Sequence, residues 1–140
     1  MNTPDPKRIH VVEQHVGVRL PAEYVQYLQK GQAITEGGFG IHIEGDQCGI
    51  RNTFRLDDAD DTSQLDEVCR LVADVLPSGA LPIAEDWAGN FFCLMLADPT
   101  VGQVVFWEHE RDADDHSVVP VSISFQQFLR NIVPEDSTRI

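Results

Sequence analysis

The longest apolar stretch of the chain, residues 91–97, most constrains how the chain can fold. It reads Phe-Phe-Cys-Leu-Met-Leu-Ala, without the polar alternation of a half-buried strand. This pattern is typical of a central strand that is covered on both faces. Residues 98–102, Asp-Pro-Thr-Val-Gly, have the composition of a turn, and residues 103–108 return as a second strand. The two segments predict an antiparallel hairpin at the centre of a sheet.

Shorter segments predict further strands around this hairpin. Residues 39–43 and 50–56 alternate between apolar and polar side chains, which indicates half-buried strands. Residues 81–84 form a short apolar segment, and Pro82 within it cannot donate a ladder hydrogen bond. Proline is found mainly in edge strands, so this segment is expected at an edge of the sheet. Residues 118–121 predict a last short strand.

Four segments with apolar side chains at helical spacing predict helices, each delimited by proline or glycine. At the start of the last one, Ser124 and Gln127 form a capping box. The serine hydroxyl accepts from the third helical N–H, and the glutamine side chain reaches back. The four segments are residues 9–16, 21–31, 65–75 and 125–132.

Short turns between neighbouring strands indicate antiparallel pairing, with the helices packed on the sheet. The sequence therefore predicts an α+β domain with a mostly antiparallel sheet of about five to six strands and three to four helices. A length of 140 residues fits a single domain. We expect the domain to span 1–140, with its core at about 9–133 and short flexible tails.

The charge of the chain is strongly unbalanced. Asp and Glu number 23 and Lys and Arg number 10, which gives a net charge of −13. Such a surface repels phosphate backbones and anionic lipid and attracts basic proteins. We therefore expect no nucleic acid, no membrane and a basic protein partner, with the chain itself a monomer or a weak dimer.

Cysteine usage and the N-terminal sequence point to the cytoplasm. Cys48, Cys69 and Cys93 are odd in number, and their spacing matches no zinc site. The first residues lack the apolar core of a secretory signal, and no stretch reaches the roughly 18 apolar residues of a membrane span. We expect a cytoplasmic protein with no metal, no cofactor and no catalytic residues.

Two acidic segments are candidate partner-binding sites. Their side chains could steer a basic partner toward the chain, because charge complementarity chiefly speeds encounter. They could equally be solvated surface without a partner. The second segment also contains two histidines and could hold a cation, although it lacks the ligand spacing of an EF-hand. The candidates are Asp57, Asp58, Asp60 and Asp61 in the first segment, and Glu108, Glu110, Asp112, Asp114 and Asp115 in the second.

The two tryptophans differ in context. Trp107 lies inside a predicted strand and is expected in the core. Trp87 comes just before the turn residues Gly89 and Asn90. An exposed tryptophan beside acidic residues would be a candidate hot spot for a partner. The alternative, which the sequence favours, is that Trp87 covers one end of the core.

Several motifs together resemble the SUKH superfamily of Smi/Knr-like proteins. The segment 20–28 resembles the family's LP-x-x-Y-x-x-x-L helix, and residues 81–90 resemble its LPIA-x-D-x-x-GN segment. Residues 102–109 are similar to its G-x-V-x-x-W-x-H strand, and 124–129 to its closing SF-x-x-FL helix. At residues 30–32 the chain has Lys-Gly-Gln where the family commonly has an Asn-Gly-Gly turn.

The resemblance implies an α+β domain without known enzymatic activity. Many bacterial members are immunity proteins that bind and neutralise a cognate toxin, often a nuclease, and fungal relatives are regulatory interaction proteins. The expected function is thus an immunity protein for a basic toxin domain. A regulatory or scaffold module is the alternative, and a metal-dependent enzyme using residues 108–116 is a remote one.

Overall fold

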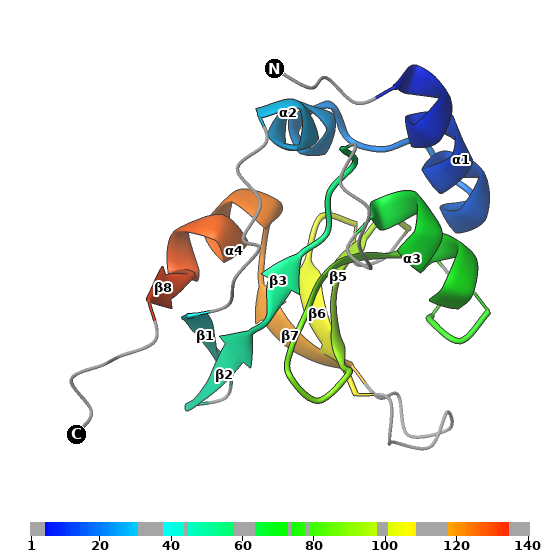
Figure 1. The fold of residues 1–140 in the computed structure, drawn as a ribbon. Helices are drawn as coiled ribbons and strands as arrows, with labels where there is room; N and C mark the ends of the chain where they lie inside the picture. The colour runs from blue at the N-terminus through cyan, green and yellow to red at the C-terminus, as the bar shows by residue number, and fades with distance from the viewer. Residues whose placement is uncertain are drawn as a thin grey trace.

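The computed structural model describes residues 5–30, 38–43, 45–57, 64–72, 74–77, 79–97, 101–108 and 118–134. Helices and strands follow one another along these residues in the order shown in Figure 1. They are α1 (Pro6–Val16), α2 (Ala22–Lys30), β1 (Phe39–Ile43), β2 (Asp46–Ile50), β3 (Asn52–Thr53), α3 (Leu65–Val72), β4 (Ala80–Glu85), β5 (Phe91–Met95), β6 (Val104–Trp107), β7 (Val118–Ser122), α4 (Phe125–Asn131) and β8 (Val133–Pro134). The α+β class predicted from the sequence is confirmed.

The predicted central hairpin is present as β5 and β6. These strands pair antiparallel from Phe91 opposite Trp107 to Leu94 opposite Val104. In the described part of the chain they lie within a five-stranded antiparallel sheet of order β3-β4-β5-β6-β7. Phe92, Cys93 and Leu94 are almost fully buried, as expected for the middle of a central strand.

The predicted strand at residues 50–56 is broken at Arg51. Ile50 ends β2, which belongs to a separate three-stranded sheet of order β2-β1-β8. Asn52 begins β3 in the larger sheet, opposite Glu85. Because this segment passes from one sheet to the other, it is enclosed on both sides. Thr53, which the alternation placed outward, is therefore 2% exposed.

The prediction that residues 81–84 form an edge strand is wrong. This segment lies in β4, which pairs with both β3 and β5. Proline is tolerated there because β3 is short and pairs only with Ala84 and Glu85. Pro82 lies beyond the end of β3, at a register shift in the pairing with β5. A missing N–H therefore breaks no described ladder bond.

Local sequence signals place the ends of two helices. Asp5 caps α1 by accepting from the Lys7 backbone N–H at 2.9 Å, and Gly17 ends it in the left-handed conformation at φ 84°. Ser124 caps α4 by accepting from the Gln127 N–H at 3.1 Å. The Gln127 side chain accepts from the N–H of Ile123, one residue earlier than in the predicted capping box.

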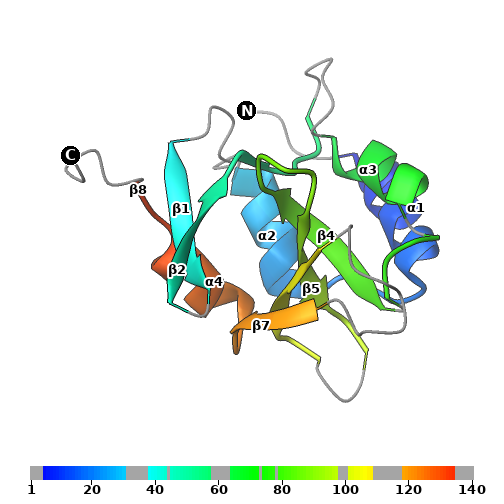
Figure 2. The ribbon, with the colours of Figure 1, turned by 90° about the horizontal axis from the view of Figure 1, so that it is seen from below.

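The two faces of the larger sheet are covered unequally. One face contributes Phe92, Leu94 and Phe106 to a core cluster that includes side chains from all four helices and from the smaller sheet. In Figure 2 these covering elements are spread along the larger sheet, with β1, β2 and α4 at the left of the view and α1 and α3 at the right. The opposite face of β5 and β6 carries a smaller cluster, in which Leu76 packs with Cys93 and Val105.

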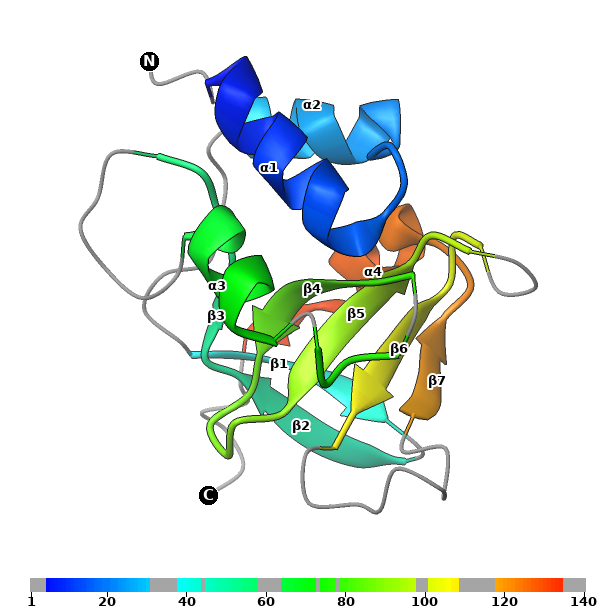
Figure 3. The same ribbon diagram turned by 90° about the vertical axis from the view of Figure 1, so that its right-hand side faces the viewer.

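The connection that contains Leu76 runs from α3 to β4 across this second face, which is turned toward the viewer in Figure 3. Beyond it, the apolar side chains of this face are only partly buried. They include Phe91, Met95, Trp107 and Val118. The larger sheet therefore has one fully covered face and one face that is half open to solvent.

Candidate interaction surface

The half-open face ends in a row of side chains at one end of the larger sheet. Strand register places residues opposite one another from β3 to β7, and opposed residues in antiparallel strands point to the same face. The row consists of Asn52, Glu85, Phe91, Trp107 and Val118. Asn52 is buried, whereas the other four are partly exposed.

Aromatic packing holds the middle of this row. The rings of Phe91 and Trp107 stack with their centroids 5.9 Å apart, and the ring of Phe54, which follows β3, packs against Phe91 at 5.9 Å. Trp107, expected in the core, packs against the smaller cluster and remains partly exposed. The stack provides a firm apolar surface at the end of the sheet.

The turn between β4 and β5 presents Trp87 beside this row. Asp86 is buried, with 8% of its surface exposed. Its carboxylate accepts three hydrogen bonds, from the Ala88 N–H, the Asn90 N–H and the Asn90 side-chain amide, at 2.9, 2.8 and 3.0 Å. Gly89 supplies the positive φ of 88° that the turn requires. The hydrogen bonds among the residues of the D-x-x-GN motif thus hold the backbone of the turn in one conformation.

Trp87 points outward from this turn and is 63% exposed. The prediction that it covers the end of the core is therefore wrong, since the Asp86 carboxylate, rather than the indole, closes the turn. The Arg51 guanidinium lies over the indole ring, 5.8 Å from its centroid. This cation–π contact restricts the orientation of the exposed ring.

Glu85 is the charged member of the row. Burial raises the pKa of the Glu85 carboxyl, and the positive charge of Arg51 opposes this rise. The net direction is upward, so the groups around Glu85 compensate its charge incompletely. A cation brought close to Glu85 would stabilise the ionised carboxylate.

Glu108 follows Trp107 directly and is partly exposed. The structure therefore brings two of the predicted site residues, Trp87 and Glu108, to the same end of the sheet. The remaining residues of the second acidic segment, Glu110, Asp112, Asp114 and Asp115, lie outside the described residues. We call the set Glu85, Trp87, Phe91, Trp107, Glu108 and Val118 the tryptophan face.

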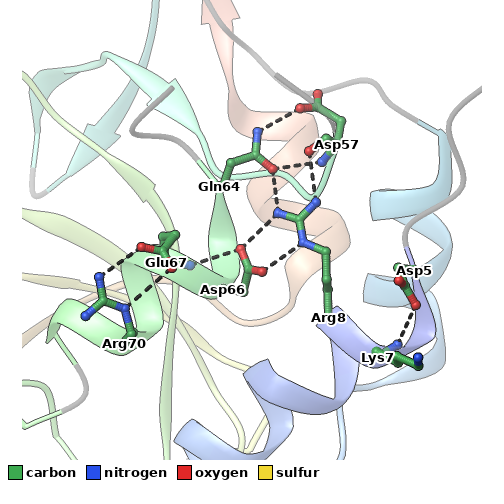
Figure 4. Close-up of polar contacts among 8 residues, drawn as sticks. All are labelled: Asp5, Lys7, Arg8, Asp57, Gln64, Asp66, Glu67 and Arg70. Carbon is green, nitrogen blue, oxygen red and sulfur yellow. Dashed lines mark hydrogen bonds and ion pairs between the residues drawn. The ribbon is translucent and has the colours of Figure 1, made fainter. Parts of the chain in front are cut away.

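The first acidic segment joins the fold at a different place, beside the start of α1. Asp57 accepts from Arg55 Nε at 2.6 Å and from the Gln64 amide at 2.7 Å. Arg8 of α1 donates to the Asp57 carbonyl at 2.9 Å (Figure 4). Asp57 thus contributes to internal packing, and it is not brought together with Trp87. Asp58, Asp60 and Asp61 lie outside the described residues.

The same arginine joins α1 to α3. Arg8 donates to both carboxylate oxygens of Asp66, at 2.8 and 2.9 Å, and to Gln64 at 2.8 Å. The hydrogen bond from Arg8 holds the pKa of the Asp66 carboxyl below its usual value. Arg8, which lies near the first acidic segment, is therefore engaged in contacts within the fold.

Sequence reasoning missed four members of the tryptophan face, Glu85, Phe91, Trp107 and Val118. Phe91 was assigned to a strand covered on both faces, because an apolar stretch does not distinguish full from partial cover. Its register opposite Glu85 and Trp107 is the signal that places it at the open end. That register depends on strand pairing, which the sequence pattern alone did not supply.

A second hollow in the described part of the chain contains a cysteine. A cavity of about 290 Å³ between α1, α3 and β4 is lined by Cys69, by His15 and by apolar residues that include Leu76 and Pro82. Burial raises the pKa of this thiol to about 12, so it stays protonated at neutral pH. Within the described ranges, no cluster of histidine, cysteine and acidic side chains could hold a metal ion, and no helix could cross a membrane.

The Arg8–Asp66 pair predicts a pH-dependent contribution to stability. Because the folded-state pKa of Asp66 is lowered, the contribution is present above the unfolded value of about 4 and is lost as pH falls through the lower folded value. Asp66→Asn should lower the free energy of unfolding at pH 7 by about 1 kcal/mol, since water partly screens this pair, whose side chains are 28% and 17% exposed.

Urea denaturation at pH 7 and at successive values below pH 4 would measure this difference. The gap between wild type and Asp66→Asn should narrow as the pH falls. Glu67→Gln, which alters the exposed Glu67–Arg70 pair on the same helix, serves as the control and should have little effect at any pH. A gap that stays constant with pH would contradict the assignment.

The Asp86 turn predicts unequal effects of two substitutions. Asp86→Ala removes three hydrogen bonds and leaves two backbone N–H groups without their acceptor, so the free energy of unfolding should fall by about 2 kcal/mol or more. Asp86→Asn keeps one oxygen for both backbone groups and should lose about half as much. Equal losses in the two variants, measured by urea denaturation, would contradict the role given to the backbone bonds.

Comparison with known proteins agrees with the motifs. The sequence model of the SMI1 / KNR4 family (SUKH-1) matches residues 3–131. The chain is also similar to the SPbeta prophage-derived uncharacterized protein YokK of Bacillus subtilis strain 168, with 25% identity over 146 residues, covering 92% of this chain and 74% of YokK. No solved structure matches the chain. Because the family match extends over most of the sequence, the chain belongs to the SMI1/KNR4 family, SUKH-1.

Proposed function

We propose that this protein is an immunity protein that binds a cognate toxin domain of basic charge and neutralises it in a stoichiometric complex. The observation that carries the proposal is an exposed tryptophan, held on a hydrogen-bonded turn, in a chain with a net charge of −13. Such a tryptophan is a frequent anchor of protein–protein interfaces. Family membership supports the same conclusion, since many bacterial members act as immunity proteins.

The proposed mechanism is binding without catalysis. The active site of a nuclease is basic because it holds a phosphate backbone, so an acidic protein can occupy or distort it. Charge attraction would speed encounter in the cytoplasm, where toxin and immunity protein would meet. Buried apolar contact would then set the lifetime of the complex.

The two acidic segments would contribute unequally to this attraction. Asp57 is hydrogen-bonded to Arg55 and lies close to Arg8, so its charge is largely compensated within the fold. Glu108 lies beside Trp107 at the open end of the sheet. Because Glu108 places the second segment next to exposed aromatic side chains, we assign steering to this segment before the first, with Asp58, Asp60 and Asp61 as secondary contributors.

A regulatory or scaffold role is the alternative, because an exposed tryptophan on an acidic surface also suits a partner that is not a toxin. The two functions differ in what the partner does when it is alone. A toxin domain arrests growth in the absence of this protein, whereas a scaffold partner does not.

Co-expression tests the proposal directly. The C-terminal domain of a multidomain toxin encoded beside this gene is expressed from an inducible promoter, with and without this protein. We expect growth arrest by the toxin domain alone, restored growth on co-expression, and a 1:1 complex in size-exclusion chromatography. An unrelated protein of similar size and charge serves as the control. Continued arrest in the presence of folded, soluble protein would contradict the immunity function.

A further inference from the structure

We propose that the tryptophan face is the docking surface for the toxin domain, and that it receives a segment of the toxin bearing arginine or lysine side chains. This inference rests on the proposed function and specifies which surface carries it. The juxtaposition behind it is an exposed indole, a stacked aromatic pair and two carboxylates at one end of the larger sheet.

The surface has an apolar centre with a charged edge. Phe91, Trp107 and Val118 form a continuous partly exposed row across β5, β6 and β7. Glu85 lies at one side of this row, and Glu108 follows Trp107. Stable interfaces have this arrangement, in which a water-excluding apolar centre is surrounded by polar groups.

The charged groups of the surface favour a cationic partner. Glu85 and Glu108 are acidic and partly exposed, whereas the Asp86 carboxylate is buried and accepts the hydrogen bonds of the turn. Arg51 is the opposing cation, and its guanidinium already lies over the Trp87 ring. The chain as a whole carries a net charge of −13, which favours a cationic partner at this surface. A lysine or arginine from the partner would reduce this excess and could pack on the aromatic rings.

The placement of Arg51 also shows which chemistry the indole accepts. A guanidinium over the Trp87 ring is an internal example of the contact that a partner arginine would make with Trp107 or Phe91. Glu85, whose charge Arg51 compensates only in part, would gain from a second cation. An acidic or phosphorylated segment would lose both of these interactions.

Two exposed apolar residues lie away from the tryptophan face. Leu71 and Val75 are 68% and 59% exposed near the end of α3, and both are aliphatic. They lie near the opposite end of β4, where Ala80 pairs with Met95. Leu71 is therefore a matched control, since it is apolar, as exposed as Trp87 and away from the tryptophan face.

The protein contains its own reporter for this surface. Its sequence has two tryptophans, Trp87 and Trp107, and both belong to the tryptophan face. Titration with the purified toxin domain should therefore change tryptophan emission in a saturable way with 1:1 stoichiometry, provided the toxin domain is made with its own tryptophans replaced by phenylalanine. Trp107→Phe and Trp87→Phe separate the two signals.

Affinity of the variants for the toxin domain then tests the surface, by calorimetry at about 150 mM salt. Trp87→Ala should weaken binding by about 30-fold or more, as for a central tryptophan anchor. A combined Glu85→Gln and Glu108→Gln variant should weaken binding, and its affinity should depend less on the salt concentration. Leu71→Ala should stay within about twofold of wild type. Circular dichroism and thermal unfolding confirm that each variant is folded.

The outcomes separate this inference from the proposed function. If wild type does not bind the toxin domain, the immunity function is wrong, and an octa-arginine peptide then tests the surface alone. Quenching of Trp87 emission by octa-arginine, absent with octa-glutamate and reduced in Glu85→Gln, would support the cationic docking surface. If wild type binds the toxin and Trp87→Ala binds it equally well, or if octa-arginine leaves both tryptophans unaffected, the inference is overturned.

Discussion

The antiparallel pairing of β5 with β6 is the constraint on which the rest of the structure depends. These strands lie at the centre of the larger sheet, and one of their faces is buried against the helices and the smaller sheet. The register of this pair sets Phe91 opposite Trp107, and the flanking strands extend the same row to Glu85 and Val118. The surface proposed for partner binding is thus a direct consequence of how the core strands align.

The two faces of the larger sheet are covered unequally, and this difference suits the protein to binding a partner. The covered face supplies most of the buried apolar side chains and hence most of the stability. The other face is crossed by the connection near Leu76 and otherwise keeps its aromatic side chains partly exposed. Aromatic side chains on a rigid backbone lose little conformational entropy when a partner binds. Such a surface suits protein recognition better than catalysis.

Local signals in the sequence predicted much of the fold. The apolar stretch at 91–97, the helix limits at Pro6 and Gly17 and the capping serine at 124 all have short-range physical causes, and the structure confirms them. The errors concern long-range placement. Residues 50–56 pass between two sheets, and Pro82 is tolerated because a neighbouring strand is short. The alternation of apolar and polar residues nearby in the sequence predicts neither of these features.

The candidate site was predicted only in part, for the same reason. Exposure of Trp87 depends on the Asp86 carboxylate closing the turn, and the role of Glu85 depends on its register with Phe91. Asp57 was grouped with its acidic neighbours by sequence, yet its carboxylate accepts from Arg55, and Arg8 of a distant helix donates to its backbone carbonyl. The charge count of the sequence shows that the protein is acidic. The position of the tryptophan face could be determined only from the strand register.

The most direct test of the central claim is nuclear magnetic resonance of the ¹⁵N-labelled protein with its unlabelled toxin domain. Trp87 and Trp107 give two indole N–H signals at the tryptophan face, and the Leu71 backbone amide reports on the end of α3. The account predicts that both indole signals shift on complex formation while the Leu71 amide stays in place. A complex in which the indole signals remain unchanged and the α3 amides shift would contradict it.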